Sequence, residues 1–393
     1  MTRTRMLAAA LLVLATGCAS GRTETADPGP AEAVPHGYVE GAVETAEPQQ
    51  RLVVADGETG AVRVLDLTTA QTFTLGRVGG VDGIAGDGRF AYLTSGRGKA
   101  LNIVDGGTWT VDHGDHLHHY RAEARDVGTL ARRSPQAVRS DPAVAAVSFS
   151  DGSVELLDRT GLGKGEITRI GVTEGDGTAL PYREHLILPV AGDAVDVRTA
   201  DGEPVTSFDE PCAEPRGAAV TRAGAVLGCA DGALLVVEDD GAFTAEKIAY
   251  PGEVPRERRA RHFEHRPGGT TLAAKAGGRG VWLLDVRAKK WTLLKTGPPV
   301  AVCATGPDTP VLILTADGFL RAYDPESGRQ TAKTALIGEP APGTQVIEAD
   351  ASRAYVNDPA ARVIHEIDYN DGLRLARTLD PGITPTHMVE TGR

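Results

Sequence analysis

One structural unit recurs along most of this chain, and this repetition limits the possible folds more than any other feature. Each copy contains a short apolar run, a turn, a second apolar run and an acidic residue. The copies lie at residues 51–67, 90–106, 144–159, 185–202, 224–241, 270–287, 310–328 and 353–372. Strand-like repeats spaced by about 40–45 residues are typical of β-propellers, in which each repeat forms one blade. The sequence therefore predicts an all-β propeller.

The turns inside the repeats favour the same fold. Asp-Gly pairs stand between two apolar runs at residues 56–57, 151–152, 231–232 and 317–318. Such pairs are typical of β-hairpins whose backbone needs a positive φ. The 48 glycines show no triplet period, which excludes a collagen-like chain.

The two ends of the repeat region complement each other. Later repeats begin with an additional short strand, as at residues 81–89 and 345–353, whereas the first repeat has no such strand before it. The last residues, 383–393, resemble a strand of this kind with no repeat after it. We therefore expect the C-terminus to complete the first blade and close the ring, which also removes open sheet edges. The count favours eight blades, with seven as the alternative.

The N-terminal residues read as an export signal. Residues 1–18 have a basic start, a short apolar run and then Gly17-Cys18, a pattern that resembles a bacterial lipoprotein signal. The run is too short to span a bilayer permanently. We expect lipidation at Cys18, with a plain cleaved secretory signal as the alternative. Residues 19–50 are rich in Glu, Pro, Ala and Thr and predict a disordered tether, so the propeller is assigned to residues 51–393.

Charge and cysteine content narrow the possible partners. The net charge is −12, which disfavours nucleic acid and anionic lipid, so we expect membrane contact only through the lipid anchor. We also expect a monomer. Because an exported protein meets oxidising conditions, Cys212 and Cys229 are candidates for a disulfide, which leaves Cys303 free and buried.

A cluster of histidines is the most distinctive local feature. His113, His116, His118 and His119 fall within seven residues, together with Asp115. The interval between the second and third repeats is the longest and contains this segment. Because residues 109–111 read as an outer strand and the next inner strand begins near Gln136, we place the cluster in an outer-to-inner connection. In a propeller such connections lie around the mouth of the central channel.

These residue types favour a metal site. Neutral imidazole is a common zinc ligand, and carboxylate oxygen can complete a tetrahedral set. In an extended segment His116 and His118 project to one side and His119 to the other, with His113 or Asp115 as a third ligand. An incidental, solvated metal-binding tract is the alternative.

Three further histidines lie on or beside expected inner strands. His262 and His265 precede the sixth repeat, and His387 lies in the C-terminal strand. If the blades have the expected register, these side chains meet the histidine-rich loop on one face and add ligands. Ordinary packing or surface placement is the alternative for each of them.

The segment HGDHLHHY at residues 113–120, followed by RAE, resembles the AztD-type zinc metallochaperones, and so does the paired-cysteine segment 212–235. The resemblance implies an extracytoplasmic β-propeller that binds Zn²⁺ and passes it to the solute-binding protein of a zinc ABC importer. The matching positions are His113, Asp115, His116, His118 and Tyr120. Two departures are visible: the tether has only His36, and Arg216-Gly217 stands where His-Gly is expected, so that His262 or His387 could replace that ligand.

We therefore expect a zinc chaperone rather than an enzyme. A catalytic zinc needs fixed ligands, an open water position and a general base, and the sequence contains no HExxH, GxSxG or phosphate-binding glycine loop. A zinc-dependent hydrolase or lyase is one alternative, and a cell-envelope interaction propeller with an incidental histidine loop is another. Because affinity generally favours copper over zinc, the choice of zinc depends on geometry, availability and the resemblance.

Overall fold

The structure is a computed structural model that describes residues 40–113, 116–131, 134–340 and 343–393. The predicted signal, Cys18 with its expected lipidation, most of the predicted tether and the candidate ligand Asp115 lie outside these ranges. The chain divides into two units, 1–36 and 37–393, and only the second is described below. Among the described residues, no helix has the length and apolar character that a membrane span needs.

Within the described residues, eight antiparallel sheets contain the eight repeats, and their strands are given below from the inner to the outer one. The first four sheets are β34 (His387–Thr391), β2 (Arg51–Ala55), β3 (Ala61–Asp66) and β4 (Thr72–Arg77); β5 (Val81–Gly86), β6 (Phe90–Ser95), β7 (Ala100–Asp105) and β10 (Arg125–Leu130); β11 (Pro135–Ser140), β12 (Val144–Phe149), β13 (Ser153–Asp158) and β14 (Arg169–Glu174); and β15 (Leu180–Tyr182), β16 (His185–Pro189), β17 (Val195–Thr199) and β18 (Pro204–Phe208).

The other four sheets follow the same plan, except that the sixth has three strands. They are β19 (Ala218–Thr221), β20 (Gly224–Cys229), β21 (Gly232–Asp239) and β22 (Ala242–Ala249); β23 (Thr271–Lys275), β24 (Val281–Asp285) and β25 (Lys290–Leu294); β26 (Pro299–Ala304), β27 (Val311–Thr315), β28 (Phe319–Tyr323) and β29 (Gln330–Ala335); and β30 (Ile347–Ala349), β31 (Arg353–Asp358), β32 (Val363–Asp368) and β33 (Arg374–Leu379). The short helices are α1 (Arg159–Lys164), η1 (Arg256–Arg258) and η2 (Gly277–Arg279).

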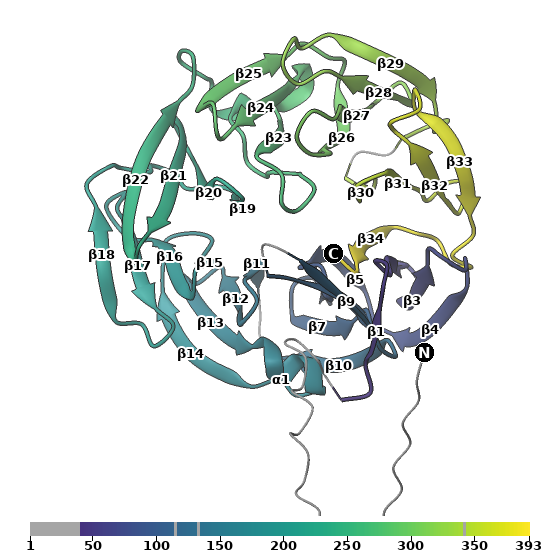
Figure 1. Cartoon of the computed structure of the whole chain (residues 1–393), viewed down its shortest axis with the longest axis horizontal. Coiled ribbons are helices and arrows are strands. Elements are labelled where there is room, and N and C mark those ends of the chain that lie inside the picture. Colours follow the sequence, from purple (N-terminus) through teal and green to yellow (C-terminus); the bar gives the residue numbers. More distant parts are fainter. Residues whose placement is uncertain (1–39, 114–115, 132–133, 341–342) are drawn as a thin grey trace, which may run out of the picture. The chain divides into compact units, whose positions relative to one another are not determined.

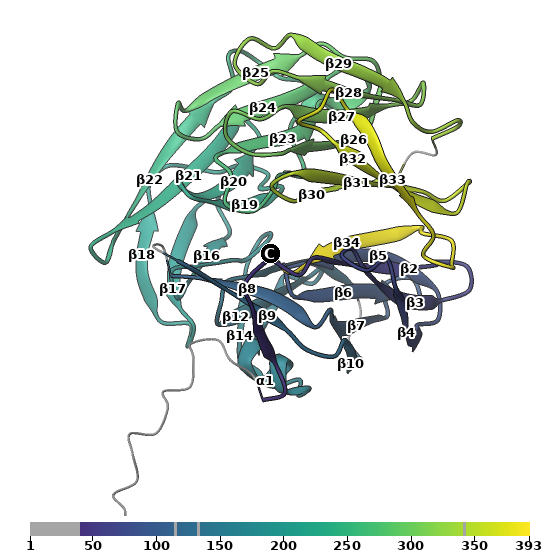
Figure 2. The same ribbon diagram turned by 45° about the vertical axis from the view of Figure 1, so that its right-hand side comes forward.

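The sheets stand side by side around a common centre, with strands such as β34, β5, β19 and β30 nearest to it (Figures 1 and 2). This arrangement confirms the prediction of an all-β propeller. The burial pattern explains why the strands form. The five residues of β2 are all buried, whereas β4 is mostly exposed, so each sheet packs its middle strands between its neighbours and turns its outer strand to solvent.

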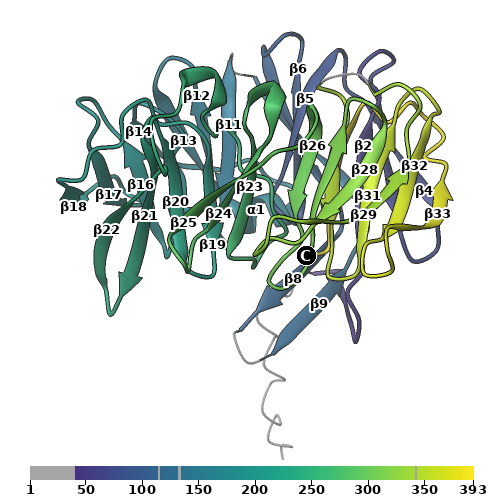
Figure 3. The ribbon, with the colours of Figure 1, turned by 90° about the horizontal axis from the view of Figure 1, so that it is seen from above.

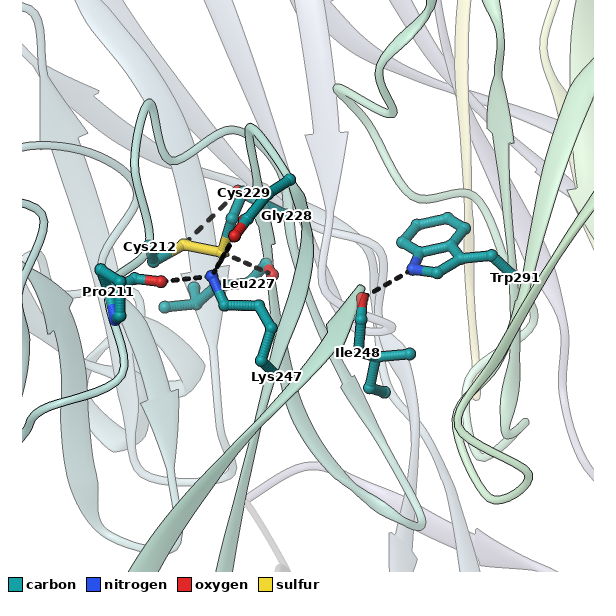
Figure 4. The surroundings of a disulfide bond; sticks show 9 residues. Pro211, Cys212, Leu227, Gly228, Cys229, Lys247, Ile248 and Trp291 are labelled. Carbon is teal, nitrogen blue, oxygen red and sulfur yellow. Dashed lines mark hydrogen bonds and ion pairs between the residues drawn. A yellow bond between two sulfur atoms is a disulfide. The ribbon is translucent and has the colours of Figure 1, made fainter. Parts of the chain in front are cut away.

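Apolar contacts between neighbouring sheets form the core. Between the fifth and sixth sheets, Trp282, Trp291 and Tyr250 pack together with ring centroids 4.6–5.9 Å apart. The indole Nε1–H of Trp291 donates to the carbonyl of Ile248 at 2.9 Å, which joins β25 to β22 (Figure 4). A hydrogen bond of this kind satisfies the one polar atom of a buried tryptophan.

The Asp-Gly turns have the positive φ that the sequence predicts in three repeats, at Gly152, Gly232 and Gly318. In the first repeat Gly60 has a φ of 73° instead, because the turn between β2 and β3 is longer. Gly57 serves a different purpose there. Its N–H donates to the Thr386 hydroxyl at 2.7 Å, and a Cβ at this position would lie 3.0 Å from a backbone oxygen.

A disulfide joins Cys212 to Cys229, the pair that the sequence predicts, and Cys303 is a buried free thiol. The bond connects the segment before β19 to the end of β20 (Figure 4). Close by, Lys247 of β22 donates to the carbonyl of Pro211 and pairs with Asp231 at 2.9 Å. The fifth sheet therefore holds the chain that enters it by both covalent and polar contacts.

The C-terminal strand β34 pairs with β2 in the first sheet. Val389 lies opposite Val53, and Thr391 lies opposite Arg51. The last residues of the chain thus supply the innermost strand to the sheet that contains the first repeat, as the sequence predicts.

A ninth sheet contains the histidine-rich segment and consists of β1 (Val43–Thr45), β9 (Leu117–Arg121) and β8 (Thr108–Asp112). The prediction that this segment is an outer-to-inner connection is wrong. Residues 109–111 belong to β8, and the β8–β9 hairpin is inserted between β7 and the outer strand β10 of the second sheet. The sequence predicts a disordered tether over residues 19–50, but strand β1 lies within this range, because residues 43–45 pair with the edge of β9.

Candidate metal centre

The β8–β9 hairpin arranges the histidines by its register. His118 lies opposite Val111, His119 opposite Thr110 and Tyr120 opposite Trp109. Since side chains alternate along a strand, His118 and Tyr120 share one face of the hairpin and His119 lies on the other. The backbone N–H of His113 donates to the carbonyl of His116 at 3.1 Å, which brings the two ends of the turn together.

His113, His116 and His118 form a cluster in which one ring nitrogen of each lies within 4.8 Å of the others. Their ring centroids are 4.8–5.2 Å apart. His113 and His116 are exposed and His118 is partly buried, so an ion can reach the cluster from solvent. Three imidazoles at this spacing match the nitrogen ligands that zinc accepts, and a fourth ligand would complete a tetrahedron. Asp115, also a candidate, lies outside the described residues.

An aromatic pair on the hairpin lies next to the cluster. The rings of Trp109 and Tyr120 stack with centroids 5.4 Å apart, and both side chains are buried. The Arg89 guanidinium lies 3.7 Å from the Trp109 ring and is itself paired with Asp105 at 2.8 Å. These contacts fix the hairpin to the second sheet. Burial, followed by the charge of Glu44, raises the pKa of Tyr120, so its hydroxyl stays protonated.

Glu44 of β1 also contacts the cluster, and sequence reasoning missed it. Its carboxylate Oε1 lies 2.6 Å from Nδ1 of His118. The two residues are 74 positions apart, so no local pattern in the sequence connects them.

His119 has a different environment from its neighbours. It is 9% exposed, and its Nδ1 lies 2.9 Å from the Thr110 hydroxyl, which donates to the carbonyl of Gly392. Burial lowers the pKa of His119, so its ring is neutral at physiological pH. It is not part of the three-histidine cluster.

The hairpin projects from the end of the sheets at which the inner strands terminate (Figure 3). The hydroxyl groups of Thr108 and Thr391, the last residue of β34, are 3.1 Å apart. At the hairpin tip, Asp112 lies 3.7 Å from Arg222, which follows the last residue of β19. The histidine cluster is therefore held over this end of the sheets, from the second sheet toward the fifth.

His387 begins strand β34 and lies opposite Ala55, whereas Thr391 of the same strand contacts the hairpin. Four residues of extended strand span about 13 Å, so His387 lies toward the other end of the sheets. Burial lowers the pKa of this histidine. The expected convergence of His387 on the histidine-rich loop is not found in the described residues.

His262 and His265 also lie outside the cluster. His265 forms a parallel bridge with Ala304, the last residue of β26, and its Nε2 lies 3.3 Å from the carbonyl of Val220. Burial and the neighbouring cations Arg393 and Arg139 lower the pKa of His265 to about 4. Desolvation by the surrounding protein, followed by the charge of Arg139, lowers the pKa of His262. Both rings are therefore neutral at physiological pH.

Charged side chains from the inner strands pair at the centre. Arg393 contacts Glu348 of β30 at 2.8 Å and Glu390 of β34 at 3.0 Å. Desolvation by the surrounding protein, followed by the charge of Glu348, raises the pKa of Glu264 to about 7. Within the described residues, this group does not bring three metal-ligating side chains together.

Solved structures with the same architecture include two of AztD from Citrobacter koseri, one of them the apo protein. They are 19% identical to this chain, cover 88% of it and 98% of their own length, and have TM-scores of 0.73 and 0.74. The dihydro-heme d1 dehydrogenase NirN, in complex with DHE, is 16% identical, covers 88% of this chain and 76% of its own, and has a TM-score of 0.57. No protein-family model and no curated protein matches the chain. Its resemblance to the AztD-type proteins is thus confirmed in the fold.

Proposed function

We propose that this protein is an extracytoplasmic zinc metallochaperone. The observation that carries the proposal is the cluster of His113, His116 and His118 on a projecting hairpin. Three ligands from one short segment can hold an ion and still leave a coordination position open. An acceptor that supplies its own ligands there can displace the histidines one at a time, without releasing the ion.

The remaining features support the setting of this function. The disulfide agrees with an oxidising compartment, and the sequence of residues 1–18 agrees with export and lipid anchoring at Cys18. We propose that the acceptor is the solute-binding protein of a zinc ABC importer and that the protein is a non-enzymatic monomer. We also propose that the eight sheets are eight blades and that the β34–β2 pairing closes the ring.

The test is the zinc stoichiometry and affinity of the purified protein, measured by competition with a chelator. We expect tight binding that falls by orders of magnitude in the His116→Ala/His118→Ala double variant, because two of three nitrogen ligands are lost. His185→Gln is the matched control, because His185 lies in β16 and contacts Phe243 rather than the cluster.

Transfer to an acceptor is measured next, with excess chelator present to trap free zinc. Faster loading of the acceptor in the presence of this protein supports direct transfer. Weak zinc binding, or tight binding that the double variant retains, would remove the hairpin as the metal site and leave a cell-envelope interaction propeller as the better interpretation.

A further inference from the structure

We propose that Glu44 is a positioning residue for the metal centre: it accepts the Nδ1–H of His118, directs the Nε2 of that ring toward the ion, and thereby couples docking of strand β1 to metal binding. This inference rests on the proposed function, because it concerns the same centre.

The strand pairing places Glu44 where it can act. In the β1–β9 register Glu44 lies opposite Tyr120, and His118 is two residues away on the same face of β9. Side chains diagonally related in this way across an antiparallel pair are within reach of each other when they are long. The observed distance of 2.6 Å between Oε1 and Nδ1 is that of a strong hydrogen bond.

The chemistry of imidazole turns this contact into orientation. A carboxylate without its proton is only an acceptor, so Nδ1 of His118 must carry the hydrogen. In the neutral ring the lone pair is then on Nε2, which becomes the metal-binding atom. A carboxylate–histidine–metal arrangement fixes both the tautomer and the ring orientation, and loss of such a partner typically lowers metal affinity by about 10–100-fold.

Glu44 lies in a short N-terminal arm, residues 42–47, which includes strand β1 and is held by few contacts. Strand β1 has three residues, and the exposed fraction of the Val43 side chain is 64%. The Thr45 hydroxyl donates to the carbonyl of His119 at 3.3 Å, and Ala42 packs against the Trp109–Tyr120 pair. If Glu44 favours the metal-bound form, metal binding must by linkage favour the docked arm to the same extent. The arm therefore both supports the centre and responds to its occupation.

The first experiment compares the zinc affinity of Glu44→Ala, Glu44→Gln and the control Glu47→Gln by chelator competition. Alanine removes the acceptor, and we expect an affinity loss of about 10–100-fold. Glutamine still accepts the Nδ1–H through its amide oxygen, so we expect a clearly smaller loss. Glu47→Gln removes the same charge from the same arm and is expected to match the unchanged protein. If glutamine costs as much as alanine, Glu44 is a direct ligand and the proposal is overturned.

The second experiment observes the ring itself by ¹⁵N NMR of the histidines. We expect His118 to hold a proton on Nδ1 with and without zinc, and to shift at Nε2 when zinc binds. Coordination through Nδ1 would overturn the proposal. In parallel, hydrogen exchange at residues 43–45 is expected to slow when zinc is added, and unchanged exchange would refute the coupling.

These measurements separate the two levels of inference. If the protein binds no zinc, the proposed function fails. The contact with Glu44 can still be tested, because the Nδ1–H of His118 should be protected from exchange in the unchanged protein and lose that protection in Glu44→Ala. If zinc binds tightly and the Glu44 variants behave like the unchanged protein, the positioning role fails and the proposed function stands.

Discussion

Adjacent histidines in the hairpin have opposite roles because the side chains of a strand alternate. His118 faces the cluster, whereas His119 turns toward Thr110 and the end of β34. The period of two residues is enough to predict this division from the sequence. Glu44 could not be predicted in the same way, because its contact with His118 depends on a strand pairing that spans 74 residues.

Mutation can therefore distinguish the role of His118 from that of His119. We expect His119→Ala to lower the free energy of unfolding by about 1–3 kcal/mol, because a buried hydrogen bond is lost and a cavity is left. His118→Ala, at a more exposed position, should cost less stability and much more zinc affinity. Urea unfolding and chelator competition on both variants check this. A loss of zinc in His119→Ala equal to that in His118→Ala would contradict the assignment.

A second residue-scale prediction concerns pH. The pKa of His265 is lowered to about 4 in the folded protein, below the ordinary value of 6.5, because the surrounding protein desolvates the ring and the cations Arg393 and Arg139 lie nearby. The unfolded chain therefore binds a proton at His265 more readily than the folded protein does. The stability that the neutral His265 contributes is thus fully present above pH about 6.5 and is lost as the pH falls toward 4. In His265→Gln the amide can still donate to Val220, and we expect a shallower loss of stability across this range. Melting temperatures at several pH values measure it, and equal slopes would contradict the prediction.

At the scale of elements, the hairpin shows that a strand can be predicted from the sequence while its pairing partner cannot. The run from Thr108 to Asp112 has the composition of a strand, so the sequence predicts that it forms the outer strand of the second repeat. Composition identifies a strand but does not identify its partner. The true outer strand, β10, pairs with β7 only after an inserted hairpin, and this pairing moves the histidines to the other end of the sheets.

The disulfide adds a covalent link between the segment that leads into β19 and the end of β20. Strand β19 has four residues and follows a segment without regular structure, and the bond closes a loop with a sequence separation of 17. A loop of this size contributes about 3 kcal/mol by limiting the unfolded chain. We expect the Cys212→Ser/Cys229→Ser variant to lose about that much stability in urea unfolding. Reductant should lower the stability of the unchanged protein but not that of the variant; an effect on both would assign the loss to another cause.

For the whole molecule, the repeats predicted the class of fold because each blade buries the same pattern of strands against its neighbours. Their number and spacing carry no information about which side chains meet across the ring. Residues such as Thr391 and Arg222, which contact the hairpin, lie far from it in the sequence. The position of the histidine cluster over one end of the sheets could therefore be found only in the structure.

We expect strand β34 to determine whether the sheets unfold as one cooperative unit. Met388 and Val389 are buried, and their strand lies between β2 of the first sheet and β5 of the second. Deletion of residues 387–393 exposes the edge of β2 and the apolar surface beneath it. We expect the truncated chain to unfold at lower urea concentration, with a broadened transition, and to aggregate.

A circular permutant separates the loss of this strand from the loss of its connection. A Cβ at Gly392 would lie 2.3 Å from the backbone of Gln49, so a short linker can join residue 393 to residue 50 and make β34–β2 a local hairpin. With new termini between residues 383 and 384, this permutant keeps every strand of the eight sheets. It should recover the cooperative transition that the truncated chain lacks. If the truncated chain unfolds as cooperatively as the full one, β34 does not close the ring, and the blades hold together through contacts between neighbouring sheets alone.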